Sequence, residues 1–329
     1  MKTRKITRLW KLLLPAVLAS QVIAGASHAQ SYPSKQVRVV VGFAPGGASD
    51  IVARILAQKL GEVWGQTVVV ENRPGASGII GADAVARAAP DGYTLLVSSQ
   101  TSTAVAPSMY VNLPYDALKD FAVVTVIGLT PMILVVHPSL PTKTFQEFVP
   151  FAKAHAKDLS FGSSGHGGTG HLAGELLNLS LGIRMTHVPY KGEPPALTDV
   201  IGGNLSFMFP SLPAALPLLK SGRLRGLGVA SLKRSPHAME YPTIAESGIP
   251  GFETVSWNAL YAPAALPKEI VARLNADAAR VLQMPDAIER LGQQGVDPVG
   301  NSSEQATAYL KAETEKWAKV IKAAGLRPQ

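Results

Sequence analysis

The residues best suited to chemistry lie near the start of the chain, in the glycine-rich segment Phe43-Ala-Pro-Gly-Gly-Ala-Ser-Asp50. An apolar, β-branched run from Val37 precedes this segment, and apolar residues spaced as on one helical face follow it as far as Leu60. The pattern predicts a strand, a tight loop and a helix. Glycine lets a backbone approach a ligand closely, and the unpaired N–H groups of a helix's first turn favour an anion. This first loop is therefore a candidate anion site.

A second loop of the same kind spans residues 162–170, with the sequence Gly-Ser-Ser-Gly-His-Gly-Gly-Thr-Gly. It too follows a predicted strand and precedes a predicted helix. Ligands of open α/β sheets bind at the carboxyl ends of the strands. Two such loops facing each other could hold a carboxylate through backbone amides, without a full counter-charge.

Neither loop matches a nucleotide-binding or nucleophile motif. The first has the glycine spacing of a P-loop, but Ala48 stands where the phosphate-binding lysine is required. The second resembles a nucleophile elbow, but His166 replaces its closing glycine. A hydrolase or transferase that uses Ser163 or Ser164 is the enzymatic alternative, and no His and Asp partners can be assigned to either serine. We therefore expect no enzymatic activity.

The histidines lack the spacing of a known metal motif. His166 and His171 are five residues apart and do not share one helical face, and Glu175 lies a turn beyond them. We expect no metal ion and no cofactor. His171, near the positive end of a predicted helix, should be neutral and could bond either the ligand or the loop.

The elements that must position these loops alternate between strand and helix. The predicted strands are Val37–Phe43, Thr67–Glu71, Tyr93–Val97, Met132–Val136, Leu159–Gly162, Arg184–Pro189, Leu205–Phe209 and Leu224–Ala230. The predicted helices are Ser49–Leu60, Ile79–Ala88, Gly170–Leu181, Pro195–Ile201, Lys268–Gln283 and Ser303–Ala324. This alternation favours an α/β fold with mostly parallel, doubly wound sheets.

The chain is long enough for about two domains. Turn signals at 128–131 and 248–250 predict two crossings between lobes. The predicted division is a signal peptide at 1–29, a first lobe at 30–130 plus 251–329, and a second lobe at 131–250.

The first 29 residues have the pattern of a secretory signal. A basic region precedes the apolar run 12–26, which is shorter than the roughly 20 residues of a spanning helix. Small residues before and at Ala29 supply a cleavage site. We predict cleavage after Ala29, with Ala24-Gly25-Ala26 as the alternative site, and a mature protein in the periplasm.

Charge and cysteine content exclude several function classes. The leader holds five of the 31 Lys and Arg and none of the 23 Asp and Glu, so the formal charge of +8 comes largely from it. No dense basic run remains in the mature chain, which argues against a nucleic-acid partner. The absence of cysteine excludes a thiol nucleophile and a cysteine-type metal site.

These motifs together resemble the Bug family, the extracytoplasmic solute receptors of tripartite tricarboxylate transporters. The resemblance covers essentially the whole mature chain and rests, beside the two loops, on Glu71-Asn-Arg-Pro-Gly-Ala-Ser-Gly78, Pro90-Asp-Gly-Tyr-Thr-Leu-Leu96, Val188-Pro-Tyr-Lys-Gly192 and Pro242-Thr-Ile-Ala-Glu-Ser-Gly248. It implies a type II periplasmic-binding-protein architecture, a small carboxylate in a cleft between two lobes, and the permease subunits of the transporter as partner. We expect a monomer.

The two glycine loops and the family resemblance together predict which residues form the ligand site. Candidate ligand contacts are Phe43, Gly47, Ala48, Ser49, Ser163, Ser164, Gly165, Thr169, His171 and Tyr190. The residues expected to shape the first loop are Pro45, Gly46 and Asp50, since a carboxylate aimed at an anionic ligand would repel it.

Several roles stay open at this point. Glu193 stands where the resemblance implies a small residue, and Ser206 where it implies an acidic one, so the distal end of the ligand is undetermined. Trp257 could line the cleft or belong to the core. A ligand-loaded sensor for a membrane kinase is the alternative to transport.

Overall fold

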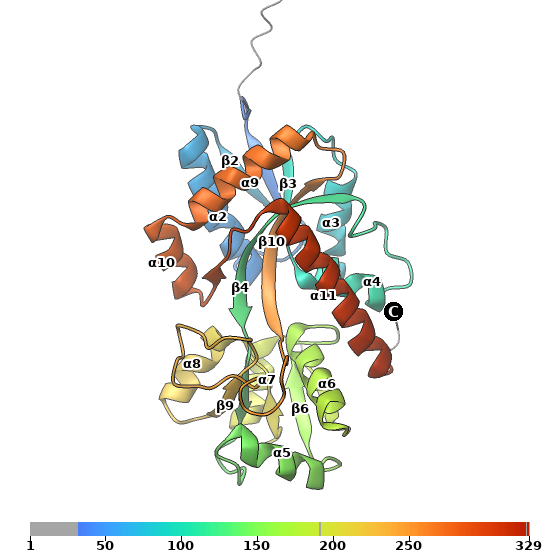
Figure 1. Cartoon of the computed structure of the whole chain (residues 1–329), viewed down its shortest axis with the longest axis vertical. Helices are drawn as coiled ribbons and strands as arrows, with labels where there is room; N and C mark the ends of the chain where they lie inside the picture. Colours follow the sequence, from blue (N-terminus) through green and yellow to red (C-terminus); the bar gives the residue numbers. More distant parts are fainter. Residues whose placement is uncertain (1–31, 191, 327, 329) are drawn as a thin grey trace, which may run out of the picture. The chain divides into compact units, whose positions relative to one another are not determined.

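The computed structural model of the chain describes residues 32–190, 192–326 and 328, and these build two β-sheets with helices packed on their faces (Figure 1). The predicted secretory signal and its cleavage site lie outside the described residues. Within the described part, no helix is long and apolar enough to cross a membrane.

The first sheet has the strand order β11-β4-β10-β3-β1-β2. Its parallel part consists of β1 (Val37–Val41), β2 (Val68–Asn72) and β3 (Thr94–Ser99). Its antiparallel part consists of β4 (Phe121–Pro131), β10 (Val255–Pro263) and β11 (Asp297–Pro298). The first glycine loop follows β1, so it emerges at the carboxyl end of the parallel part.

The second sheet has the strand order β7-β6-β8-β5-β9. Its strands are β5 (Ile133–Val136), β6 (Ser160–Ser163), β7 (Thr186–Pro189), β8 (Phe207–Met208) and β9 (Arg225–Val229). β6 runs parallel to β7 and β8, whereas β5 runs antiparallel to β8 and β9. The second glycine loop follows β6.

The parallel pattern expected from the sequence applies to β1–β3 and to β6–β8, and the remaining pairings are antiparallel. For β4 and β10, the antiparallel pairing follows from the path that the chain takes between the two sheets. β4 leads through Met132 directly into β5, and β10 brings the chain back beside β4. Two neighbouring strands that run between the same two sheets in opposite chain directions must pair antiparallel.

Helices cover both sheets. The longer ones are α2 (Ala48–Trp64), α3 (Ile79–Ala86), α5 (Phe145–Ala154), α6 (Thr169–Leu181), α7 (Glu193–Ile201), α8 (Leu212–Lys220), α9 (Lys268–Leu282), α10 (Pro285–Gln293) and α11 (Ser303–Ala323). Short turns form η2 (Ala76–Gly78), η3 (Thr101–Val105) and α4 (Ala106–Met109). α2 begins in the first glycine loop and α6 in the second, as the loop patterns predict.

Each sheet has its own apolar core. The core of the first contains Phe121, Tyr261 and Trp257, and that of the second is rich in phenylalanine, including Phe161 and Phe207. Trp257 is 1% exposed, so it belongs to the core rather than to the cleft. α11 returns from the C-terminal part of the chain to pack on β4, and it also contacts α6 (Figure 1).

Candidate functional site

A cavity of about 470 Å³ is lined by residues from the first sheet, from the loops that follow strands of the second, and from helices of both lobes. Four helices contribute residues of their N-terminal ends to its wall, α2, α6, α7 and α8, and α10 contributes its C-cap, Gln294. Thr130 and Met132, where β4 passes into β5, and Ser256 at the start of β10 line it as well. The cavity thus lies where the chain crosses between the two sheets.

The first turn of α2 faces this cavity through Ala48 and Ile51. The helix is capped by Gly47, whose φ is −77° and ψ 166°, and no side chain caps its first N–H groups. The positive φ in the loop belongs to Gly46, at 80°, where a side chain would be strained. Unpaired N–H groups and the positive end of the helix dipole are therefore available to an anion.

The first turn of α6 faces the same cavity through Thr169 and Gly170. Its cap, Gly168, has extended dihedrals and no side-chain bond to the helix end. Ser164 from the preceding loop also lines the cavity. A Cβ at Gly170 would lie 2.7 Å from the carbonyl oxygen of Phe209, so only glycine fits there. The second loop thus offers N–H donors from the second lobe, whereas those of α2 come from the first.

Asp50 holds the first loop together. Its carboxylate accepts hydrogen bonds from the Gly46 N–H at 2.9 Å, from Arg54 Nε at 2.9 Å and from Asn72 Nδ2 at 2.8 Å. The bond from Arg54 lowers the pKa of Asp50 to about 2, against the opposing effect of burial. Asp50 is 2% exposed and does not line the cavity. Pro45 is an exposed residue of the same loop.

Two further candidates of the first lobe make contacts elsewhere. The Ser49 hydroxyl donates to Asn258 Oδ1 at 2.6 Å and so ties α2 to β10, while the Ser49 N–H stays in the first turn of the helix. The ring of Phe43 is half-buried against Gly78. Neither side chain lines the cavity.

In the second lobe, Ser163, Gly165 and Tyr190 also lie outside the lining. The Ser163 hydroxyl is fully buried and accepts the Gly165 N–H at 3.1 Å. Gly165 has a φ of 134°. The Tyr190 hydroxyl donates a hydrogen bond to Asp199, and this bond raises the pKa of Tyr190. These residues shape the loop and its supporting strand.

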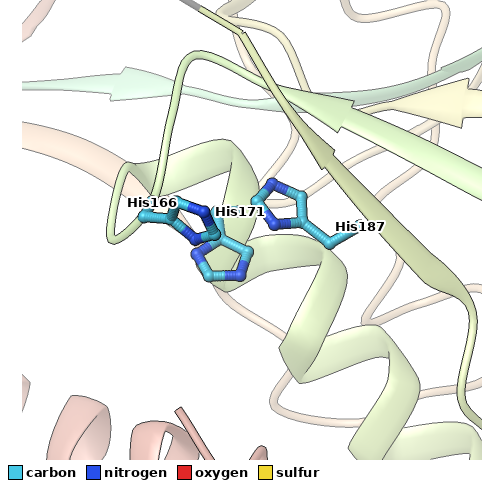
Figure 2. Close-up of side chains that lie close together, drawn as sticks. All are labelled: His166, His171 and His187. Carbon is cyan, nitrogen blue, oxygen red and sulfur yellow. The ribbon is translucent and has the colours of Figure 1, made fainter. Parts of the chain in front are cut away.

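Three histidine rings lie together at the second loop: His166 on the loop itself, His171 on α6 and His187 on β7 (Figure 2). His171 is 1% exposed, and its Nδ1 accepts the Gly167 N–H at 3.0 Å. Its ring stacks on that of His187, with 3.8 Å between ring centroids and 18° between planes. Burial lowers the pKa of His171 to about 4 and that of His187 to about 3, so both rings are neutral near pH 7.

This cluster offers one nitrogen from each ring, all within 4.8 Å of one another. The lone pairs of an imidazole lie in the ring plane, so those of two stacked rings do not converge on one point. The arrangement is one of packed rings, with His171 stacked on His187. Sequence reasoning weighed His166 and His171 but missed His187, which β7 brings beside them through its pairing with β6.

The pair formed by Ser163 and His187 bears on the enzymatic alternative. Ser163 Oγ lies 2.7 Å from His187 Nε2, the spacing of a nucleophile and its base. However, Ser163 is fully buried and does not line the cavity. The pKa of about 3 also makes His187 a poor base near pH 7. The geometry is that of a structural hydrogen bond.

Of the nominated ligand contacts, the cavity lining contains Ala48, Ser164 and Thr169. It also contains residues that sequence reasoning did not nominate, such as Ser211 and Gln294. Ser211 follows a predicted strand by two residues, so its place at the carboxyl end of that strand was a signal that could have identified it.

Comparison with known proteins gives this site its context. Residues 52–326 match the model of the tripartite tricarboxylate transporter family receptor, TctC. The chain belongs to this receptor family. The protein BugT of Bordetella pertussis is 36% identical over 94% of this chain and 95% of its own length. The Bug-family resemblance inferred from the motifs is thereby confirmed.

Solved structures of family members share the fold. The structure of R. palustris Rpa4515 with adipate has a TM-score of 0.78 and 39% identity, covering 91% of this chain and all of that one. MatC from Rhodopseudomonas palustris, with bound malate, has a TM-score of 0.73 and 33% identity, covering 88% and 100%. The two-lobed α/β binding-protein fold is confirmed, and the relatives are solute-binding receptors rather than enzymes.

Proposed function

We propose that this receptor captures a small carboxylate between its two lobes in the periplasm and delivers it to the permease subunits of a tripartite tricarboxylate transporter. The observation that carries the proposal is the shared cavity. The uncapped first turns of α2 and α6, which follow glycine loops in different sheets, line the same space of about 470 Å³. Two helix N-termini directed at one cavity favour an anionic ligand.

The chemistry of the lining supports recognition by neutral donors. The described lining residues include no Lys, Arg or His. A carboxylate would therefore be held by backbone N–H groups and hydroxyls, which bind more weakly than a guanidinium and suit a protein that must release its cargo. The ligand class comprises organic acids, aromatic acids and acidic amino acids. Adipate and malate occupy two of the solved relatives.

The remaining parts of the proposal follow from the leader and the family. The basic and apolar segments before Ala29 fit export, and the family is that of transporter receptors. We propose a monomer that uses no cofactor, binds no nucleic acid and catalyses no reaction.

A thermal-shift screen tests the ligand class. The mature protein is heated with mono-, di- and tricarboxylates, aromatic acids and acidic amino acids, with sugars and simple cations as controls. A bound acid should stabilise the protein by RT ln(1 + [L]/Kd), about 2.7 kcal/mol at a hundredfold excess over Kd. Stabilisation by sugars or cations alone would refute the proposal. Uptake of the identified acid by cells with and without the receptor tests delivery.

A further inference from the structure

The wall of the cavity contains a carboxylate of the protein itself. Glu193 is the first residue of α7, is half-buried and lines the cavity. Its Oε1 accepts the Ser211 N–H at 2.8 Å, and its Oε2 accepts the Ser211 hydroxyl at 2.9 Å. Ser211 is the N-cap of α8 and lines the cavity too. The side chain of Glu193 therefore fills the anion position at the N-terminus of α8.

This placement puts in the cavity wall a carboxylate that is bonded to the N-terminus of α8 but meets no cationic side chain among the described residues. No ion pair joins Glu193 to a cationic side chain of the described residues, and the described lining contributes no cation of its own. The two bonds from Ser211 use part of the acceptor capacity of a carboxylate, which offers about four lone-pair positions. The free positions can accept hydrogen bonds from a ligand. A second ligand carboxylate at the same place would meet a like charge in a partly desolvated space.

We propose that Glu193 forms a subsite for a cationic or hydrogen-bond-donating group, so that the receptor prefers a carboxylate with a distal protonated amine over a dicarboxylate of the same length. This inference rests on the proposed function, because it assumes that the first turns of α2 and α6 hold the ligand carboxylate. In effect, Glu193 occupies the position that a second ligand carboxylate would take. The chemical class selected is that of amino-substituted monocarboxylates.

Calorimetric titration with matched ligand pairs tests the inference. Adipate and 6-aminohexanoate have the same six-carbon chain and differ only in the distal group, and glutarate with 5-aminopentanoate and succinate with 4-aminobutanoate extend the comparison to shorter chains. We expect the mature wild-type protein at pH 7 to bind the amino acid of the best-fitting pair at least tenfold more tightly than the diacid.

Two substitutions separate charge from shape. Glu193→Gln keeps the side-chain length and an oxygen acceptor for Ser211 but removes the charge, so the preference for the amine should fall at least tenfold. Glu193→Ala vacates the N-terminus of α8, so the diacid should gain affinity and the order of the pair should reverse. Glu315→Gln, at an exposed position of α11 that does not line the cavity, removes the same charge and should leave the preference unchanged.

The outcomes distinguish this inference from the proposed function. A wild-type protein that binds the diacid as tightly as its amino partner, or a Glu193→Gln variant with the wild-type ratio, overturns the role of Glu193 while carboxylate capture stands. A protein that binds neither member of any pair, nor any acid in the wider screen, overturns the proposed function and this inference with it. Should Glu193→Ala fail to fold by circular dichroism, the ratio measured for Glu193→Gln decides.

Discussion

At the residue scale, Asp50 shows how the proposed anion-binding loop can contain a carboxylate of its own. Its carboxylate accepts hydrogen bonds from Arg54, Asn72 and the Gly46 N–H, and these bonds fix the loop that precedes α2. The carboxylate thus stabilises the shape of the loop and keeps its charge out of the cavity. Because these partners favour the ionised form, the pKa of Asp50 falls below its unfolded value of 3.8 to about 2.

This shift predicts a pH dependence of stability. A carboxyl whose folded pKa is depressed adds stability that is fully present above about pH 4 and is lost as the pH falls towards 2. The shift corresponds to about 2 kcal/mol. Asp50→Asn should therefore lower the free energy of unfolding in urea by about 2 kcal/mol at pH 7 and by much less at pH 2.5. An equal loss at both values would show that the charge of Asp50 contributes nothing.

At the residue scale, sequence could locate the site but could not assign each side chain. Ala48 and Thr169 were predictable because they begin helices after glycine loops. The side chains of Ser49 and Ser163 point elsewhere because Asn258 and His187, which are distant in sequence, offer them hydrogen bonds. Such partners are set by strand pairing across the sheets, and no local pattern encodes them.

At the scale of elements, Glu313 anchors α11 to the first sheet. It is 3% exposed, and its Oε2 accepts the indole N–H of Trp257 on β10 and that of Trp317 on α11, both at 3.0 Å. Lys316 forms a close ion pair with its other oxygen. A buried carboxylate with these partners satisfies two indole donors that would otherwise be buried without an acceptor.

Substitution of Glu313 should therefore be costly, and the cost should depend on whether an acceptor remains. Glu313→Ala leaves two buried indole N–H groups unpaired and should lower the free energy of unfolding by about 3 kcal/mol. Glu313→Gln retains an acceptor oxygen and should cost markedly less. Urea unfolding monitored by tryptophan fluorescence measures both, and similar losses in the two variants would contradict this role.

The elements that sequence missed have identifiable reasons. β4 is a long, nearly continuous apolar run that is buried on both faces, so it lacks the alternation that marks a half-buried strand, and β10 is likewise buried on both faces along most of its length. α5 contains Pro150 and α8 contains Pro217 inside the helix. Because proline disfavours the interior of a helix, the local sequence does not predict these two helices. The helices that begin at the two glycine loops were predictable, because loop and apolar spacing agree there.

At the scale of the whole molecule, the proposed function requires that both lobes contact one ligand. The chain passes from the first sheet to the second along β4 and returns along β10, and the cavity lies at that crossing. Gln100, which follows β3, donates to the Thr169 hydroxyl at 2.9 Å, so a hydrogen bond already links the first lobe to the start of α6. A ligand held by α2 and α6 together would add to this link and favour a closed arrangement.

The central claim is that backbone N–H groups at the starts of α2 and α6 hold the ligand carboxylate, and proline tests it directly. Proline is tolerated at the first position of a helix, where it removes one N–H, and the extended dihedrals of Gly47 and Gly168 suit a following proline. Ala48→Val and Thr169→Val are matched controls that keep the N–H, the latter without the hydroxyl.

The deciding measurement is calorimetric titration of these four variants with the acid that gives the largest thermal shift. Each variant is first checked for folding by circular dichroism. Loss of a hydrogen bond to a charged group costs about 1.5–3 kcal/mol, so Ala48→Pro and Thr169→Pro should each weaken binding roughly 10- to 150-fold relative to their valine controls. Proline variants that bind as tightly as the valine controls would contradict the account, because the helix N-termini would then not be the site.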